Sequence, residues 1–269
     1  IADKARRIHA LPEKVHTVVH EGPFYRANAI HMSAPSPQRT PVLFQAGTSA
    51  RGLRFAGQHA EGVFIGARTP EAAREASRQL RQAAVDAGRQ PDDIKIYVGV
   101  AVVPGRTAAE AQEKYAEYQA HASAEGGLAH FAASTGVDFA RYGLDEPIAF
   151  GQSNAIQSAA AAAQQQGWTT RRKLLEQFTL GSRYTTIVGD AAQVADELER
   201  WVDVGEIDGF NLTRLVVPET WEDFATLVVP ELQNRGRYRT SYAGGTLRQQ
   251  LFGAGDRLPQ RHPAARWRR

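Results

Sequence analysis

The alternation of short apolar segments with amphipathic helical segments constrains the fold of this chain more than any other feature. Segments rich in β-branched and aromatic residues predict strands at 42–45, 62–65, 94–103, 185–188 and 209–216. Helical periodicity or cap signals follow them, giving about four strand–helix units. This alternation favours parallel strands joined by crossover helices.

Two architectures fit this number of units. A complete (β/α)8 barrel needs eight units and about 250 residues, whereas this chain of 269 residues also contains a helical, alanine-rich stretch at about 123–181. We interpret that stretch as an insertion on the rim and "AAAAAQQQ" (159–166) as helix, because alanine is the best helix former. The chain is either a doubly wound open sheet or the second half of a barrel. It begins with Ile1 and has one methionine, Met32, which suggests processing or truncation.

Local signals place several element ends. Thr69 followed by Pro70 predicts a helix start, and Gly88 predicts its end. Thr107 and Glu110 have the spacing of a capping box. Asp190 is expected to cap a helix with one apolar face. A hairpin that turns at Glu21–Gly22 and a final helix over about 219–234 complete the pattern.

The composition excludes several classes of protein. There is no cysteine, which excludes disulfides, thiolate catalysis and cysteine metal sites. Hydrophobic residues make up 42% and charged residues 23%, as in ordinary soluble domains. Neither a membrane span nor a signal segment is recognisable, so we expect a cytoplasmic protein without membrane contacts.

The net charge of +3 comes largely from the C-terminal segment. After Gln233, the sequence contains nine arginines and one acidic residue, Asp256. The arginines are Arg235, Arg237, Arg239, Arg248, Arg257, Arg261, Arg266, Arg268 and Arg269. A nucleic-acid arm is conceivable, but no nucleic-acid motif accompanies the charge. We therefore favour a solvated tail or an oligomer-wrapping arm over residues 236–269.

The stretch "PVLFQAGTSARG" (41–52) has the layout of a phosphate cradle. A strand ends at Gly47, and Thr48 or Ser49 opens a helix, whose N-terminal N–H groups and partial positive charge attract anions. A plain capped turn has the same appearance, because serine and threonine are common N-caps. The local sequence alone favours the plain turn.

Three longer stretches carry a family resemblance. They are "PVLFQAGTSARGLRFAGQHAEGVF" (41–64), "IVGDAAQVADELERWVDVGEIDGFNL" (187–212) and "DFATLVVPELQNRGRYRTSYAGGTLRQQL" (223–251). In matching order, they resemble the bacterial luciferase-like, flavin-dependent monooxygenases. The resemblance is closest to the subgroup of nitrilotriacetate monooxygenase component A and dibenzothiophene sulfone monooxygenase.

The resemblance implies a fold, a cofactor and a reaction. It implies that residues 1–235 are roughly the second half of a TIM-type (β/α)8 barrel, with an exposed apolar face and open edges. It also implies that the serine of the QAGxS motif contacts the FMN phosphate. Ser49 occupies that place, and Thr48, Gly47, Ala46 and Gln45 would line the mouth of the barrel. Reduced FMN from a separate NAD(P)H:FMN reductase, together with O2, would then oxygenate a small organic substrate in a homo-oligomeric enzyme.

The catalytic residues are not identified by the sequence. The histidines show no metal-ligand spacing, so a metal site is not expected. His121 and His130 could face the mouth of the site, as could Arg183–Tyr184 and Asn211. We interpret Glu61 as non-catalytic and Asp92–Asp93 as a solvated turn.

Three alternatives stay open. The first is a deazaflavin-dependent oxidoreductase of the same superfamily. The second is a non-catalytic remnant or assembly protein of the same fold. The third is a nucleic-acid binder that uses the arginine tail.

Overall fold

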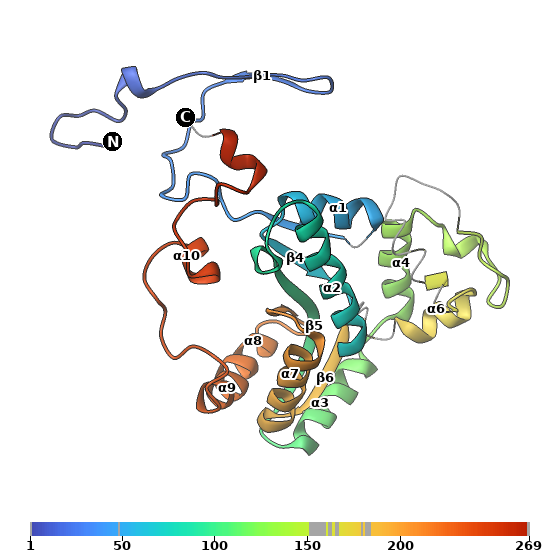
Figure 1. Cartoon of the computed structure of the whole chain (residues 1–269). Helices are drawn as coiled ribbons and strands as arrows, with labels where there is room; N and C mark the ends of the chain where they lie inside the picture. The colour runs from blue at the N-terminus through green and yellow to red at the C-terminus, as the bar shows by residue number, and fades with distance from the viewer. Residues whose placement is uncertain are drawn as a thin grey trace.

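A computed structural model describes residues 2–47, 49–150, 160, 163–164, 167–178, 180 and 184–267 (Figure 1). The strands are β1 Val18–Glu21, β2 Arg26–Ala29, β3 Phe44–Ala46, β4 Gly62–Ile65, β5 Lys95–Gly105, β6 Thr185–Asp190 and β7 Gly209–Thr213. The α-helices are α1 Ala50–His59, α2 Pro70–Asp86, α3 Ala108–Ala120, α4 Ala124–Thr135, α6 Arg171–Gln177, α7 Ala191–Gly205, α8 Glu219–Asp223, α9 Val229–Asn234 and α10 Leu247–Phe252.

The main sheet is parallel and is organised around the long strand β5. β3 pairs with β4, and β4 pairs with the first half of β5. β6 pairs with the second half of β5, and β7 pairs with its middle. Every strand-to-strand connection in this sheet contains helix, which confirms the expected crossover pattern.

One face of the sheet carries the main hydrophobic core. Val63, Ile96, Val98 and Val100 alternate along β4 and β5 and are fully buried. They pack against α1, α2, α7 and α9, which contribute Ala56, Leu80, Val194, Leu198, Trp201 and Leu232 among others. Because these helices all cover the same face, the sheet is wound like a barrel wall rather than doubly wound.

The opposite face is open over β3 and β4. Phe44 and Phe64 remain 43% and 36% exposed there, although both are large apolar side chains. The exposed apolar face expected from the resemblance is therefore present. Among the described residues the sheet does not close on itself, and that the chain is one half of a closed barrel stays a prediction.

The predicted helix ends are largely confirmed. The side chains of Ser49, Thr69 and Asp190 each accept a backbone hydrogen bond at the start of α1, α2 and α7. The capping box at Thr107 forms only in part: Thr107 accepts from the Glu110 N–H, but the Glu110 carboxylate accepts from the N–H of Arg106. The single helix expected over 219–234 is instead α8 and α9 joined by a π-helical turn, Phe224–Val228.

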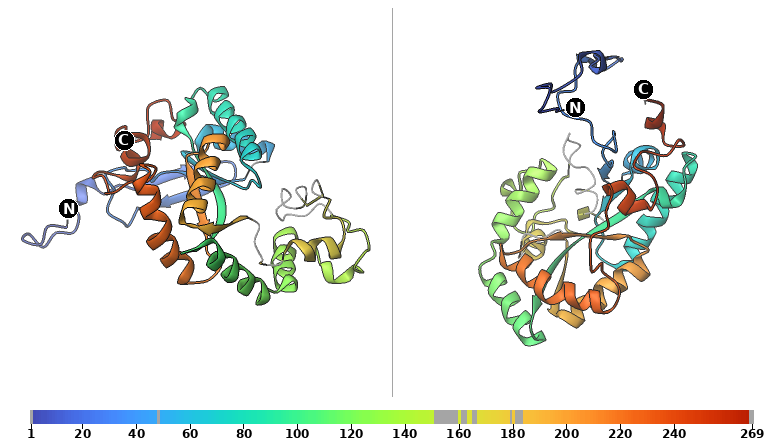
Figure 2. Two further views of the ribbon diagram at one scale, coloured as in Figure 1. Left: turned by 90° about the horizontal axis from the view of Figure 1, so that it is seen from below. Right: turned by 90° about the vertical axis from the view of Figure 1, so that its left-hand side faces the viewer.

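The predicted insertion forms a separate small unit beside the sheet (Figures 1 and 2). α4 and α6 enclose a second core that contains Leu128, Phe131, Phe139, Leu174 and Phe178. Most of the alanine-rich stretch 159–166 lies outside the described residues, so its helical interpretation is not decided.

The two terminal segments behave differently. The predicted hairpin is present as β1 and β2, and it projects from the body with every strand residue exposed (Figure 2). The C-terminal segment, in contrast, packs back on the sheet, and Arg248, Leu258 and His262 are no more than 2% exposed. The interpretation of 236–269 as a solvated tail is therefore wrong for these residues.

Candidate functional site at the carboxyl ends of the strands

The candidate phosphate cradle lies where β3 leads into α1. The N–H of Gly52 donates to Ser49 Oγ over 3.1 Å, which makes Ser49 the N-cap of α1. Gly47 has a φ of 116°, a conformation that favours glycine. Ala46, Gly47 and Ser49 thus lie at the junction of β3 and α1, while Thr48 lies outside the described residues. That they bind a cofactor stays a prediction.

The first turn of α1 is positively charged. α2, α3 and α4 each carry a glutamate in the first turn, which complements the positive end of a helix. The first turn of α1 has no acidic residue and contains Arg51, an arrangement of charge that α6 and α10 share. An exposed arginine at the positive end of a helix is unfavourable unless an anion lies beside it.

Gln45 adds a polar group beside the cradle. Its Nε2 donates to the carbonyl of Ala46 over 2.8 Å. Its Oε1 is buried and has no hydrogen-bond partner among the residues that the structure describes. A buried acceptor of this kind is expected to find a donor, and a bound ligand could supply one.

Aromatic rings cover the open face next to the cradle. Phe44 and Phe64 stack with their ring centroids 5.3 Å apart, and Tyr97 lies 5.8 Å from Phe64. Gly62 and Gly99 leave the space that the rings of Phe44 and Tyr184 fill. The face is thus a flat apolar surface of the kind that binds planar ligands.

Asn211 lies on the same open face. It is opposite Gly99 in the register of β5 and β7, and paired residues on adjacent strands point to the same side of a sheet. Tyr184 covers Gly99 from the same side, so Tyr184 and Asn211 lie on the same face of the sheet. Phe210 points to the helix-covered side, and Arg183 is outside the described residues.

The loop after β4 links the sheet to the insertion. The guanidinium of Arg68 lies 4.7 Å from the ring centroid of Trp168, and the Arg68 carbonyl accepts from Thr185 Oγ1 over 3.1 Å. Burial lowers the pKa of Arg68. The sequence reasoning missed this pair because nothing local joins residues a hundred positions apart.

The histidines do not assemble a metal site. No group of three or more potential ligands occurs among the described residues. His121 lines a cavity of about 600 Å³ with Tyr118, Leu215 and Glu219. The Tyr118 hydroxyl donates to Glu219 over 2.5 Å, and burial with this carboxylate raises the pKa of Tyr118. His130 is exposed on α4.

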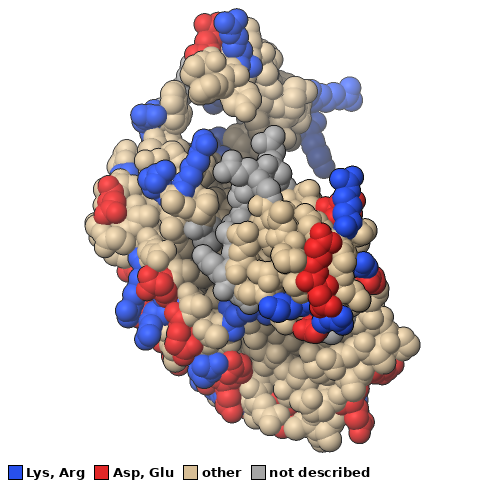
Figure 3. Space-filling view, turned by 90° about the vertical axis from the view of Figure 1, so that its right-hand side faces the viewer, with Lys and Arg blue, Asp and Glu red and all other residues tan. Residues whose placement is uncertain are grey.

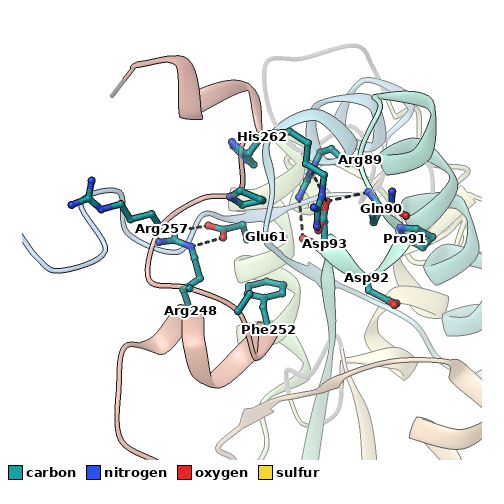
Figure 4. A pocket seen from close by; sticks show the side chains of 14 residues that line it. Glu61, Arg89, Gln90, Pro91, Asp92, Asp93, Arg248, Phe252, Arg257 and His262 are labelled. Carbon is teal, nitrogen blue, oxygen red and sulfur yellow. Dashed lines mark hydrogen bonds and ion pairs between the residues drawn. The ribbon is translucent and has the colours of Figure 1, made fainter. Parts of the chain in front are cut away.

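A second pocket, of about 460 Å³, lies at the opposite, amino ends of the strands (Figure 4). Glu61 and Arg248 meet in its wall and are 3% and 2% exposed. Asp93 is bonded to Arg261, so the interpretation of Asp92–Asp93 as a solvated turn is wrong for Asp93. Because these charged groups bond to one another, we treat the pocket as structural.

Part of the C-terminal positive charge is paired within the protein. Four of the C-terminal arginines pair with carboxylates on the body of the chain: Arg235, Arg237, Arg248 and Arg261. On the face seen in Figure 3, cationic and anionic side chains are interspersed. Among the described residues, no helix is long and apolar enough to span a membrane.

Comparisons with known proteins agree with this geometry. Residues 5–206 match the family model described as luciferase-like monooxygenase. The chain is 41% identical to dimethyl-sulfide monooxygenase of Hyphomicrobium sulfonivorans, over 99% of this chain and 56% of that protein. It is 40% identical to long-chain alkane monooxygenase of Geobacillus thermodenitrificans, over 100% of this chain and 58% of that protein. The chain therefore spans little more than half the length of these relatives.

Solved structures give the same result. The crystal structures of those two relatives superpose with TM-scores of 0.82 and 0.83, over 57% and 58% of their chains. A riboflavin lyase with modified FMN is 34% identical with a TM-score of 0.87, over 99% of this chain and 59% of that one. Dibenzothiophene-sulfone and nitrilotriacetate monooxygenases also match, at 38% and 31% identity. The chain belongs to the luciferase-like monooxygenase family.

Proposed function

We propose that this chain forms the flavin-phosphate side of a two-component monooxygenase that uses reduced FMN and O2. The junction of β3 and α1 carries the proposal, because Gly47, the serine cap and the first N–H groups of α1 lie together at the carboxyl end of a parallel strand. The names of the relatives support an oxygenating reaction. The riboflavin lyase supports FMN as the cofactor that this fold accepts.

The residues present fit a phosphate group. Ser49 Oγ already accepts from the N–H of Gly52, so its hydroxyl hydrogen is free to donate to an anion. N–H groups at the start of a helix lack partners within the helix, and Arg51 adds a positive charge. Gly47 lets the backbone approach closely.

The open face would receive the ring system and the substrate. Reduced flavin, when bound, reacts with O2 and supplies the oxygen atom that is transferred. Phe44, Phe64 and Tyr97 provide an apolar surface against which the ring system would pack. The substrate is a small organic molecule, and its apolar part would contact the same surface.

The partners follow from this proposal. A separate NAD(P)H:FMN reductase would deliver the reduced flavin. A homo-oligomer in the cytoplasm stays a prediction. The deazaflavin-dependent oxidoreductase and the non-catalytic remnant are the competing outcomes of the flavin titration described next.

Two matched cap variants test the proposal. Ser49→Ala and Thr107→Ala each remove an N-cap side chain, so each should destabilise the chain by about 1 kcal/mol. Only Ser49→Ala should weaken FMN binding, by about tenfold, because only Ser49 lies at the phosphate site. Flavin fluorescence titrations with FMN, riboflavin and a deazaflavin measure this.

Each competing function gives a distinct result. Riboflavin lacks the phosphate, so its affinity should be the same in both variants. Binding of the deazaflavin but not of FMN would favour the oxidoreductase. No flavin binding by the purified chain would favour the remnant.

A further inference from the structure

Arg68 differs from Arg81, Arg89 and Arg235 in its partners. Each of those three arginines forms an ion pair with at least one carboxylate. The Arg68 guanidinium has no carboxylate partner among the described residues and stacks on the Trp168 ring instead. The hydrogen bond that this residue accepts is made by its backbone carbonyl. A guanidinium held in place by a ring, with its N–H donors not used by a carboxylate, is a candidate anion ligand.

The position of Arg68 brings it to the cradle. Ala46 lies opposite Phe64 in the register of β3 and β4. Beyond this pair, the chain continues from β3 to Ser49 and from β4 to Arg68. Neighbouring strands in a sheet lie about 4.8 Å apart. The long arginine side chain and the N-terminus of α1 therefore share the same end of the same two strands.

Trp168 orients this arginine and belongs to a different unit. Its ring packs against the second core, formed by α4, α6 and their neighbours. The guanidinium lies 4.7 Å from its ring centroid, a cation–π contact that holds the planar group without using its N–H donors. The N–H groups of Arg68 thus stay available for an oxyanion.

We propose that Arg68, stacked on Trp168, is a second phosphate ligand that ties the insertion to the bound cofactor. The inference rests on the proposed function and extends it. The phosphate would be held from one side by α1 and from the other by Arg68. Cofactor binding would then order the insertion over the open face. An oxyanion of the substrate is the other ligand with the same chemistry, and the test separates the two.

The first measurement compares FMN with riboflavin. Arg68→Ala should raise the Kd for FMN by about tenfold, the loss of one charge-assisted hydrogen bond, and leave riboflavin binding unchanged. Arg68→Lys keeps the charge but loses the planar stack, so its effect should be intermediate. Arg266→Ala is the matched control, because Arg266 stacks on Trp267 at 5.0 Å in the C-terminal segment.

The second measurement follows the insertion itself. In the unmodified chain, FMN should slow amide hydrogen exchange in α4 and α6 at least threefold, and riboflavin should not. Arg68→Ala and Trp168→Leu should both abolish this slowing. An unchanged ratio of FMN to riboflavin affinity in Arg68→Ala, together with normal protection of α4 and α6, would overturn the flavin-phosphate assignment.

The remaining outcomes distinguish this inference from the proposed function. If Ser49→Ala weakens FMN binding and Arg68→Ala does not, the function stands and the role of Arg68 as a flavin ligand fails. If the chain binds no FMN, the function fails, and inorganic phosphate then tests Arg68 alone. A change in tryptophan emission on adding phosphate, lost in Arg68→Ala and Trp168→Leu, would support an oxyanion site for a substrate; no change in the unmodified chain would overturn it.

Discussion

The two ends of the parallel sheet differ in how their arginine side chains are paired. At the amino ends, Arg248 uses all five of its N–H donors within the protein. It bonds Glu61 twice and the carbonyls of Thr40, Pro41 and Asp256. At the carboxyl ends, Arg51 and the guanidinium of Arg68 have no carboxylate partner among the described residues.

This difference separates structural charge from functional charge. A buried charge with every hydrogen bond made inside the protein has no capacity left for a ligand. A charge whose N–H donors are not used inside the protein remains available for a ligand. The presence of a cavity would mislead here, because the 460 Å³ pocket lies at the end where the charges are paired within the protein.

The largest expected effect is the loss of the buried pair at the amino ends. Arg248→Met leaves the Glu61 carboxylate buried without its cation and should lower the free energy of unfolding by about 3–5 kcal/mol. Urea denaturation measures this. Arg68→Ala, made in parallel at the other end, should change stability by less than about 1 kcal/mol.

A double-mutant cycle sharpens the result. Glu61→Leu combined with Arg248→Met should destabilise the chain less than the sum of the single changes, because no unpaired charge is left. Equal losses from Arg248→Met and Arg68→Ala would contradict the distinction between the two ends.

A smaller effect should appear when the pH is lowered. His262 is buried at the amino end, its Nε2 donates to the carbonyl of His59, and its Nδ1 accepts from the N–H of Ala264. Burial holds the pKa of His262 below its usual value of about 6.5, and nearby Arg89 acts in the same direction, against the His59 carbonyl and Glu61. The unfolded chain therefore takes up this proton first, so stability is lost as the pH falls below about 6.5.

The size of this effect follows from one hydrogen bond. A protonated Nδ1 cannot accept from Ala264, which costs about 1 kcal/mol. Thermal unfolding at pH 7.5 and 5.5 measures the loss, and His262→Gln should reduce the difference between the two pH values. A pH dependence that His262→Gln leaves unchanged would assign it to other groups.

The elements of the fold were predictable because their signals are local. The caps at Ser49, Thr69 and Asp190 depend on residues within one helical turn, and the strands on short apolar runs. The packing of the C-terminal segment was not predictable in this way. Arg248 bonds Glu61 across 187 positions of sequence. An arginine-rich segment has the same sequence pattern whether or not the fold places carboxylates beside it.

The parts of the candidate site likewise differ in whether they depend on local sequence or on contacts between distant residues. The cradle at Gly47 and Ser49 is one continuous stretch, so a motif reveals it. The aromatic surface of Phe44, Phe64 and Tyr97 needs three strands in register, and the stack of Arg68 on Trp168 needs two units to meet.

The smallest effect gives the most direct contrast between the two ends, because stability and binding should change in opposite directions. Arg51→Glu replaces a cation with an anion in the first turn of α1, so it should stabilise the flavin-free chain by about 0.3–1 kcal/mol. The same change should weaken FMN binding, because the phosphate would then meet a negative charge. Arg54→Glu, one turn further along α1, is the matched control, since the field of the helix terminus falls off within the first turn. Urea denaturation and FMN titration of the two variants measure both effects. A destabilised Arg51→Glu chain with unchanged FMN affinity would mean that Arg51 serves the fold, and the carboxyl end would then be no different from the amino end.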